Sequence, residues 1–234
     1  KEYRRQRQMC IRDSWIRAKF GADYLLPLAR VYWEKPFAAV SDYNQHQSFY
    51  DGTIETAFTV DQTNLKIMTW FDACEKDLSA VRIHVTGDIR PVIVVEPQAM
   101  MKLHYAQKVT QMVGIEQEGE NWKVSLNCQG KESCFYVRSN ADVQPKGDKL
   151  YLTLNEGENY MLLSYKAKNS TSVIGSLQQT RDWWHQKWNE TAVIQFPDSE
   201  AQRMWVRSMA LFLSTFGNET VSYTHLTLPT ILLV

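Results

Sequence analysis

Three carboxylates lie close together in the segment WFDACEKD, at Asp72, Glu75 and Asp77. Two carboxyl groups held across a bound sugar can cleave a glycosidic bond, one as a general acid and the other as a base or nucleophile. The apolar runs on either side predict two strands, so the cluster falls on the connection between them. Acidic residues on such connections are commonly solvated. We therefore predict a solvated strand-to-strand loop and assign no catalytic residue to it.

The five histidines are candidates for metal binding and for acid–base chemistry. None of His46, His84, His104 and His185 forms an HxH or HxxxH pair, the spacing that brings two imidazoles to one metal ion. His225 lies in a terminal segment of unusual composition. The sequence predicts no metal site and no cofactor. A sugar epimerase would need a His and a Glu on one concave sheet, and the sequence does not identify that pair among His46, His84 and His104.

Cys128 and Cys134 flank the polar turn QGKES between two strand-like runs. Facing positions on a hairpin can come close enough for a disulfide, so this pair is a candidate bridge. Two half-buried thiols are the alternative. The CxxC spacing of a metal site is missing.

The two ends of the chain share an origin at the level of the coding DNA. Residues 4–14, RRQRQMCIRDS, back-translate to a sequence that resembles the transposase adapter used in sequencing libraries, and residues 221–230, VSYTHLTLPT, back-translate to its reverse complement. We interpret residues 1–13 and 221–234 as adapter-derived and exclude them from the fold prediction.

Excluding these two segments removes most of the apparent positive charge near the N-terminus. Arg4, Arg5, Arg7 and Arg12 would otherwise suggest a basic arm for nucleic acid, but all four lie in the adapter-derived segment. The remainder has no basic patch interleaved with aromatic residues, so we predict no nucleic-acid partner. No apolar run is long enough to span a membrane.

The middle of the chain has the pattern of an antiparallel β-sandwich, predicted over residues 14–170. Short β-prone runs alternate apolar and polar residues, which indicates one buried and one solvated face. Asp51-Gly52 is a hairpin signal, and EQEGEN (116–121) and NEGEN (155–159) are similar loops. The runs are YLLPLARVYW, TIETAFTV, NLKIMTWF, AVRIHV, PVIVVE, WKVSLNC, CFYVRS, KLYLTL and NYMLLSYKA.

The period changes to that of a helix after the last strand. Val173, Leu177, Trp184 and Trp188 lie at helical spacing in a helix predicted over residues 172–190. We assign residues 171–196 to this linker helix and an extended segment.

A second helix, with Asp198 or Ser199 as its N-cap and Gly217 as its C-cap, occupies residues 197–220. It would be the first helix of a truncated helical barrel. Trp184, Trp188 and Trp205 are predicted structural anchors of this part of the chain.

Several of these segments resemble the N-terminal region of bacterial glycoside hydrolases built as a β-supersandwich followed by an (α/α)6 barrel, of the family 65 and family 95 type. The strongest likeness is a W-x3-W helix, a short extended piece and a helix of the form D-x-E-x-Q-x2-W-x-R-S, here WWHQKW, TAVIQF and DSEAQRMWVRS. LPLARVYWEKPF, QHQSFYDGTIETAFTV and NLKIMTWFDACEKDLSAVRIHVTG extend it through the sandwich.

The resemblance implies the non-catalytic N-terminal portion of a periplasmic or secreted glycoside hydrolase or phosphorylase. Its carbohydrate substrate would bind through a barrel that follows this chain, and its catalytic acid and base would lie on later barrel helices, so no catalytic residue is transferred. The alternative is a stand-alone carbohydrate-binding or adhesive β-sandwich that stacks tryptophans on sugar rings. The second helix distinguishes the two functions, because its apolar face would have no partner in a binding module. The resemblance gives no oligomeric state.

Overall fold

The computed structural model describes residues 29–74, 78–97, 111–128, 131–165, 171–191 and 194–216. Within these ranges twelve strands are followed by two helices. The adapter-derived ends, Glu75, Asp77, His104 and Gly217 lie outside the described residues, so the predictions made for them stay predictions.

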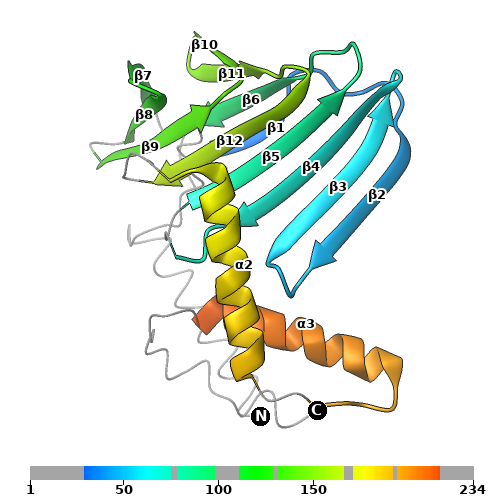
Figure 1. Cartoon of the computed structure of the whole chain (residues 1–234). Coiled ribbons are helices and arrows are strands. Elements are labelled where there is room, and N and C mark those ends of the chain that lie inside the picture. The colour runs from blue at the N-terminus through cyan, green and yellow to red at the C-terminus, as the bar shows by residue number, and fades with distance from the viewer. Residues whose placement is uncertain are drawn as a thin grey trace, which may run out of the picture.

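The larger of two antiparallel sheets has eight strands in the order β2-β3-β4-β5-β12-β9-β8-β7 (Figure 1). Neighbouring strands mostly follow one another along the chain, whereas the β5–β12 pair joins distant segments. Its strands are β2 (Ser41–Ser48), β3 (Thr53–Val60), β4 (Thr63–Phe71), β5 (Leu78–Thr86), β7 (Gln111–Glu118), β8 (Asn121–Cys128), β9 (Lys131–Ser139) and β12 (Gly157–Tyr165).

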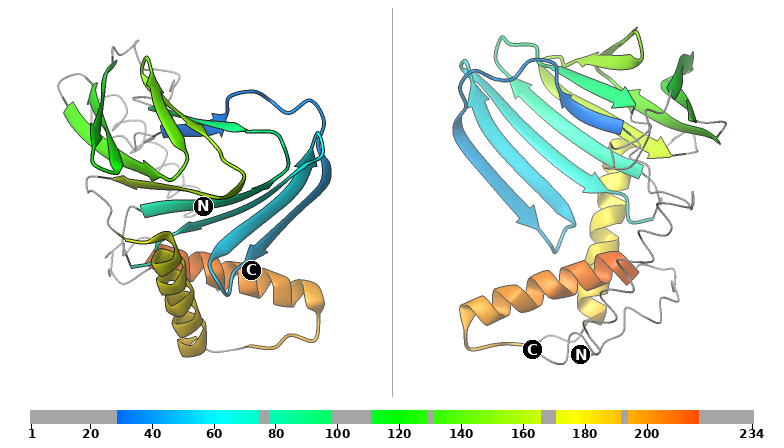
Figure 2. Two further views of the ribbon diagram at one scale, coloured as in Figure 1. Left: turned by 45° about the horizontal axis from the view of Figure 1, so that its top comes forward. Right: turned by 180° about the vertical axis from the view of Figure 1, so that it is seen from behind.

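The smaller sheet has four strands in the order β1-β6-β11-β10 and packs on one face of the larger sheet (Figure 2). It consists of β1 (Ala29–Trp33), β6 (Val92–Pro97), β10 (Asp142–Lys146) and β11 (Lys149–Thr153). Leu65, Ile83 and Phe135 of the larger sheet meet Val95 and Leu150 of the smaller sheet in one buried cluster. The predicted β-sandwich followed by helices is confirmed.

The alternation in β5 determines which side chains enter this core. Ile83 and Val85 are buried between the sheets, while Arg82 and His84 point to the opposite, outer face because successive side chains alternate along a strand. The outer face of the larger sheet is therefore partly polar.

The turns agree with the sequence only in part. Gly119 and Glu120 form a two-residue hairpin loop between β7 and β8, with Gly119 at φ +65°. The connection around Asp51-Gly52 has four residues, 49–52, because Ser48 pairs with Thr53. The connection at 154–156 is not a hairpin: it carries the chain from β11 in one sheet to β12 in the other.

Two helices, α2 (Val173–Glu190) and α3 (Ser199–Phe216), lie together on one side of the sandwich (Figure 1). The Ser172 hydroxyl caps α2 by accepting from the Gly175 amide at 3.0 Å. Asp198, one of the two predicted caps, accepts from the Ala201 amide at 2.7 Å. Neither helix is long and apolar enough to cross a membrane.

Candidate functional site

Helix α2 covers one end of the outer face of the larger sheet. Trp70, Ala80 and Leu162 lie opposite one another on β4, β5 and β12, and Leu177 of α2 packs against them. Each of these side chains is at least nine-tenths buried. The rest of this face, beyond the helix, carries the polar side chains of the candidate site.

Polar contacts inside the covered region hold α2 to the sheet. The Trp70 indole nitrogen donates to Ser176 Oγ at 3.0 Å, and the Ser176 hydroxyl donates to Asp72 Oδ2 at 2.5 Å. The Ala73 amide donates to Thr180 Oγ1 at 3.3 Å. Asp72 is only 7% exposed, so the prediction of a solvated loop is wrong for this residue. Its carboxylate has a structural role under α2.

The other half of α2 contacts the turn between β2 and β3. The Trp188 indole nitrogen donates to the Phe49 carbonyl at 2.7 Å. A Cβ added at Gly52 would lie 2.0 Å from Trp184 Nε1, so the Trp184 ring lies directly on this glycine. Trp205 is half-buried on α3. These contacts suit the predicted anchoring roles of Trp184 and Trp188, whose energies stay a prediction.

A hydrogen-bonded contact between a histidine and an aspartate accompanies the two tryptophans at this turn. His185 Nε2 lies 2.8 Å from Asp51 Oδ1, and the imidazole stacks on Tyr50 with 4.1 Å between ring centroids. The hydrogen bond with His185 lowers the pKa of Asp51, burial opposes it, and Ser48 lowers it further. The turn is thereby tied to α2 by packing, a hydrogen bond and charge.

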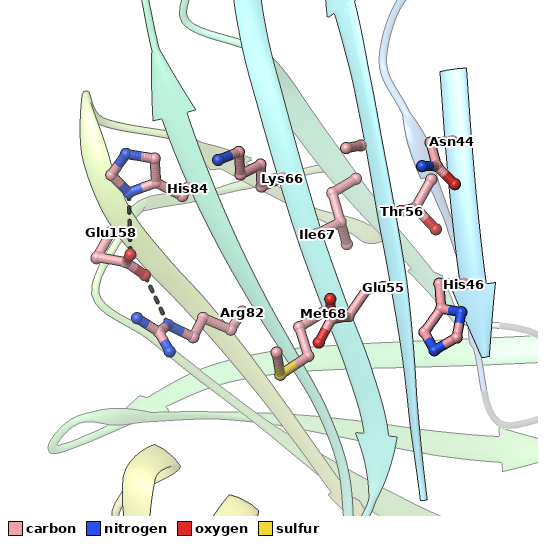
Figure 3. A pocket seen from close by; sticks show the side chains of 11 residues that line it. Asn44, His46, Glu55, Thr56, Lys66, Ile67, Met68, Arg82, His84 and Glu158 are labelled. Atoms are coloured by element: carbon pink, nitrogen blue, oxygen red, sulfur yellow. Dashed lines mark hydrogen bonds and ion pairs between the residues drawn. The ribbon is translucent and has the colours of Figure 1, made fainter. Parts of the chain in front are cut away.

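The uncovered part of the outer face is hollowed, with a volume of about 520 Å³ (Figure 3). The cross-strand register arranges the outward-facing side chains here in two rows that each cross β2, β3, β4, β5 and β12, and all of them except Tyr160 line the hollow. The first row is His46, Glu55, Met68, Arg82 and Tyr160, and the second is Asn44, Ala57, Lys66, His84 and Glu158.

Arg82, Glu158 and His84 form a connected cluster in the hollow, seen at one side of Figure 3. Arg82 Nε donates to Glu158 Oε2 at 2.7 Å, and His84 Nδ1 lies 2.9 Å from Glu158 Oε1. The hydrogen bond from Arg82 lowers the pKa of Glu158, with burial opposing it and His84 adding to the decrease. Because the ionised carboxylate only accepts, His84 carries a proton on Nδ1 and turns its Nε2 away from Glu158.

A second hollow of about 310 Å³ shares Arg82 and Glu158 with the first and extends to the first turn of α2, at Ser172 and Val173. We call the two hollows together the Arg82 groove. Among the described residues no group of three or more His, Cys, Asp or Glu side chains could hold a metal ion. The groove instead offers hydrogen-bond donors on basic side chains and acceptors on acidic side chains.

The structure brings together residues that the sequence left unconnected. His46 and His84 line one hollow with Glu55 and Glu158, so histidine and glutamate side chains do occur together on this sheet. Sequence reasoning missed Arg82 and Glu158. The alternation in LSAVRIHVT was the available signal, since it places Arg82 and His84 together on the face opposite Ile83.

The two cysteines named as a candidate disulfide do not face each other. Cys128 lies opposite Lys131, and Cys134 lies opposite Ser125. Cys134 has a free thiol. Neither the strand register nor the free thiol of Cys134 supports the candidate bridge, and the side chain of Cys128 lies outside the described ones.

No known protein-family model and no curated protein matches the sequence. Among solved structures, 21 chains match it in shape. One of them is a candidate kojibiose phosphorylase from the human microbiome, with a TM-score of 0.45 and 14% sequence identity, covering 82% of this chain and 28% of that chain. This chain thus spans less than a third of that protein's length. A likeness of this degree identifies neither a family nor a ligand.

Proposed function

We propose that this chain is the N-terminal, non-catalytic portion of a carbohydrate-active enzyme, a glycoside hydrolase or phosphorylase whose catalytic helical barrel follows α3. The support comes from the resemblance of the α2–α3 region to barrel-type glycoside hydrolases, together with the order of a β-sandwich followed by two helices. Secretion or a periplasmic location belongs to the same proposal and rests on the resemblance alone.

The observation that carries the proposal is the surface of α3. Met204 and Leu211 are each 69% exposed and Phe212 is 41% exposed, while Ala210 is the one buried residue among its described side chains. At about 100° per residue these three exposed side chains fall within one stripe of roughly 100° along α3. Such an apolar stripe on a helix normally packs against another element. Further helices packed around α3 would cover these side chains.

The chemistry of the Arg82 groove argues against one catalytic role for Glu158, that of the general acid in glycosidic cleavage. A general acid in such a reaction needs a raised pKa so that it still holds its proton near neutral pH. The pKa of Glu158 is lowered instead, because Arg82 and His84 stabilise its ionised form. Glu158 therefore stays ionised and is a poor proton donor to a leaving group.

The alternative is a stand-alone carbohydrate-binding module, and the Arg82 groove is the observation that favours it. A stand-alone module would have no need of the exposed apolar residues on α3. The two functions therefore differ in the expected behaviour of that helix.

Activity measurements test the proposal. The purified chain and a longer version, extended along the parent gene beyond Thr220, are assayed against aryl α- and β-glycosides and, with phosphate, against disaccharides. We expect no turnover by the chain and turnover by the longer protein. Met204→Ser and Leu211→Ser should also reduce self-association of the chain, because they remove exposed apolar surface. Turnover by the chain alone, or a parent gene without helices after α3, would overturn the proposal.

A further inference from the structure

We infer that the Arg82 groove is a binding site for a neutral oligosaccharide, separate from the catalytic barrel. This inference rests on the proposed role in carbohydrate chemistry and adds a site that the role does not require. The groove lies on the outer face of the larger sheet, and the α2 first turn closes one end of it.

The balance of donors and acceptors indicates a neutral ligand. Arg82 and Lys66 supply donors, while Glu55 and Glu158 supply acceptors, so the formal charges of these four side chains cancel. Arg138 also lines the second hollow, and its charge is balanced by an ion pair with Glu120 at 2.6 Å. A sugar hydroxyl both donates and accepts, so it can use both kinds of group at once. An anionic ligand would favour a site with donors in excess.

Several polar atoms in the groove are free to meet a ligand. Arg82 uses Nε for Glu158, which leaves the two terminal guanidinium nitrogens, and His84 has Nε2. Within the described chain, Lys66 and Glu55 form no ion pair or side-chain hydrogen bond, and both line the hollow. Hydrogen bonds to charged groups are the stronger ones, so a few such contacts can orient a sugar.

The floor between these polar groups is apolar. Ala57 and Met68 occupy the positions beside Lys66 and Arg82 in the two rows, and Figure 3 shows Met68 reaching across the floor between Arg82 and Glu55. An apolar floor with a small number of placed polar groups is the usual composition of a ligand site. Met68 is flexible enough to adapt to the carbon face of a sugar ring.

The dimensions favour a chain of sugars over a single one. Each row crosses five strands, and neighbouring strands lie about 4.8 Å apart, so a row extends over roughly 19 Å. The second hollow continues the groove past Tyr160. A monosaccharide would contact only part of such a row.

Stability alone does not account for the Arg82–Glu158–His84 cluster. The side chains of Arg82 and His84 are 43% exposed and that of Glu158 is 50% exposed. Ion pairs this exposed contribute little to stability, because water screens them. A binding role predicts that changing Glu158 weakens ligand binding while leaving the fold intact.

Calorimetric titration with named trisaccharides tests the inference. The neutral probes are maltotriose, kojitriose, nigerotriose, cellotriose and mannotriose, and trigalacturonate is the charged counterpart. We expect at least one neutral probe to bind at one site per chain, more tightly than its monosaccharide. Glu158→Gln and Arg82→Gln should each weaken that binding at least tenfold. Arg90→Gln is the matched control, because Arg90 forms an exposed ion pair with Glu156 outside the groove.

Each outcome of the titration either supports or overturns the oligosaccharide site. The inference is overturned by no binding of any neutral probe, by tighter binding of trigalacturonate, or by full affinity in the two groove variants. A melting temperature unchanged by Glu158→Gln shows that the variant is folded. Failure of the proposed function is seen separately: the longer protein would lack turnover while the groove still bound its trisaccharide.

Discussion

Removing the Ser176 hydroxyl should destabilise the protein far more than an exposed serine change would. This hydroxyl accepts from the Trp70 indole and donates to Asp72, and all three residues are buried. Ser176→Ala leaves both partners without this contact in a region closed to water. A buried polar group left unsatisfied costs about 1–3 kcal/mol, and more if charged. The Trp70 indole would lose its partner, whereas Asp72 would keep the hydrogen bond from the Cys74 amide at 2.8 Å. One unsatisfied group predicts a loss of about 1–3 kcal/mol in the free energy of unfolding.

Urea unfolding followed by tryptophan fluorescence measures this loss. Ser214→Ala is the control, because Ser214 is exposed and donates only to the Leu211 carbonyl of its own helix; it should cost less than about 0.5 kcal/mol. Trp70→Phe removes the indole donor, so the double variant with Ser176→Ala should lose less than the sum of the single losses by about 0.5–3 kcal/mol. A Ser176→Ala loss as small as the control's, or strict additivity, would refute the buried network.

Three further predictions concern the attachment of α2. Trp188→Ala should lower the free energy of unfolding by about 3 kcal/mol, the lower end for a tryptophan truncation because the ring is only half-buried, and a loss below about 1 kcal/mol in chemical unfolding would contradict the anchoring role. Because His185 lowers the pKa of Asp51 from 3.8, the stability that Asp51 contributes is present above this value and is lost as the pH falls through the lower folded-state pKa. Melting temperatures measured below about pH 4 should therefore fall less steeply in Asp51→Asn than in the parent, and identical slopes would exclude this contribution. Ser172→Ala should cost about 1 kcal/mol by removing the α2 cap, and the same unfolding assay would disprove a capping role if Ser172→Gly and Ser172→Ala left stability unchanged.

The sequence predicted the central strands and missed three that lie at sheet edges. β4, β5, β11 and β12 are paired on both sides, and their runs alternate buried and solvated residues. The missed strands are β2, β7 and β10, each an edge strand. An edge strand has one paired neighbour and less surface to bury, so its sequence can be as polar as SDYNQHQS. Local pattern cannot distinguish such a strand from a loop.

The Arg82 groove could not be predicted from the sequence, for a different reason. Alternation assigns Arg82 and His84 to the outer face, but it does not say which strand lies beside β5. The β5–β12 register, which sets His84 opposite Glu158, is a long-range pairing. Its partners are separated by most of the sandwich sequence, and nothing local in either strand specifies it. The Arg82–Glu158–His84 cluster could therefore be recognised only once the strand order of the sheet was known.

Asp72 and Glu158 lie on the same side of one sheet but have different roles. The difference arises because α2 covers Asp72 and leaves Glu158 open. Asp72 lies under the helix, accepts from Ser176 and is almost fully buried. Glu158 lies beyond the helix, in the lining of the groove, with half of its side chain exposed. Burial makes the contacts of Asp72 costly to lose, whereas water can replace those of Glu158 at little cost in stability. Ser176→Ala should therefore lower stability and spare trisaccharide affinity in the folded fraction, and Glu158→Gln should do the reverse. Parallel losses in both variants would show that the covered and open parts of the face act as one structural unit.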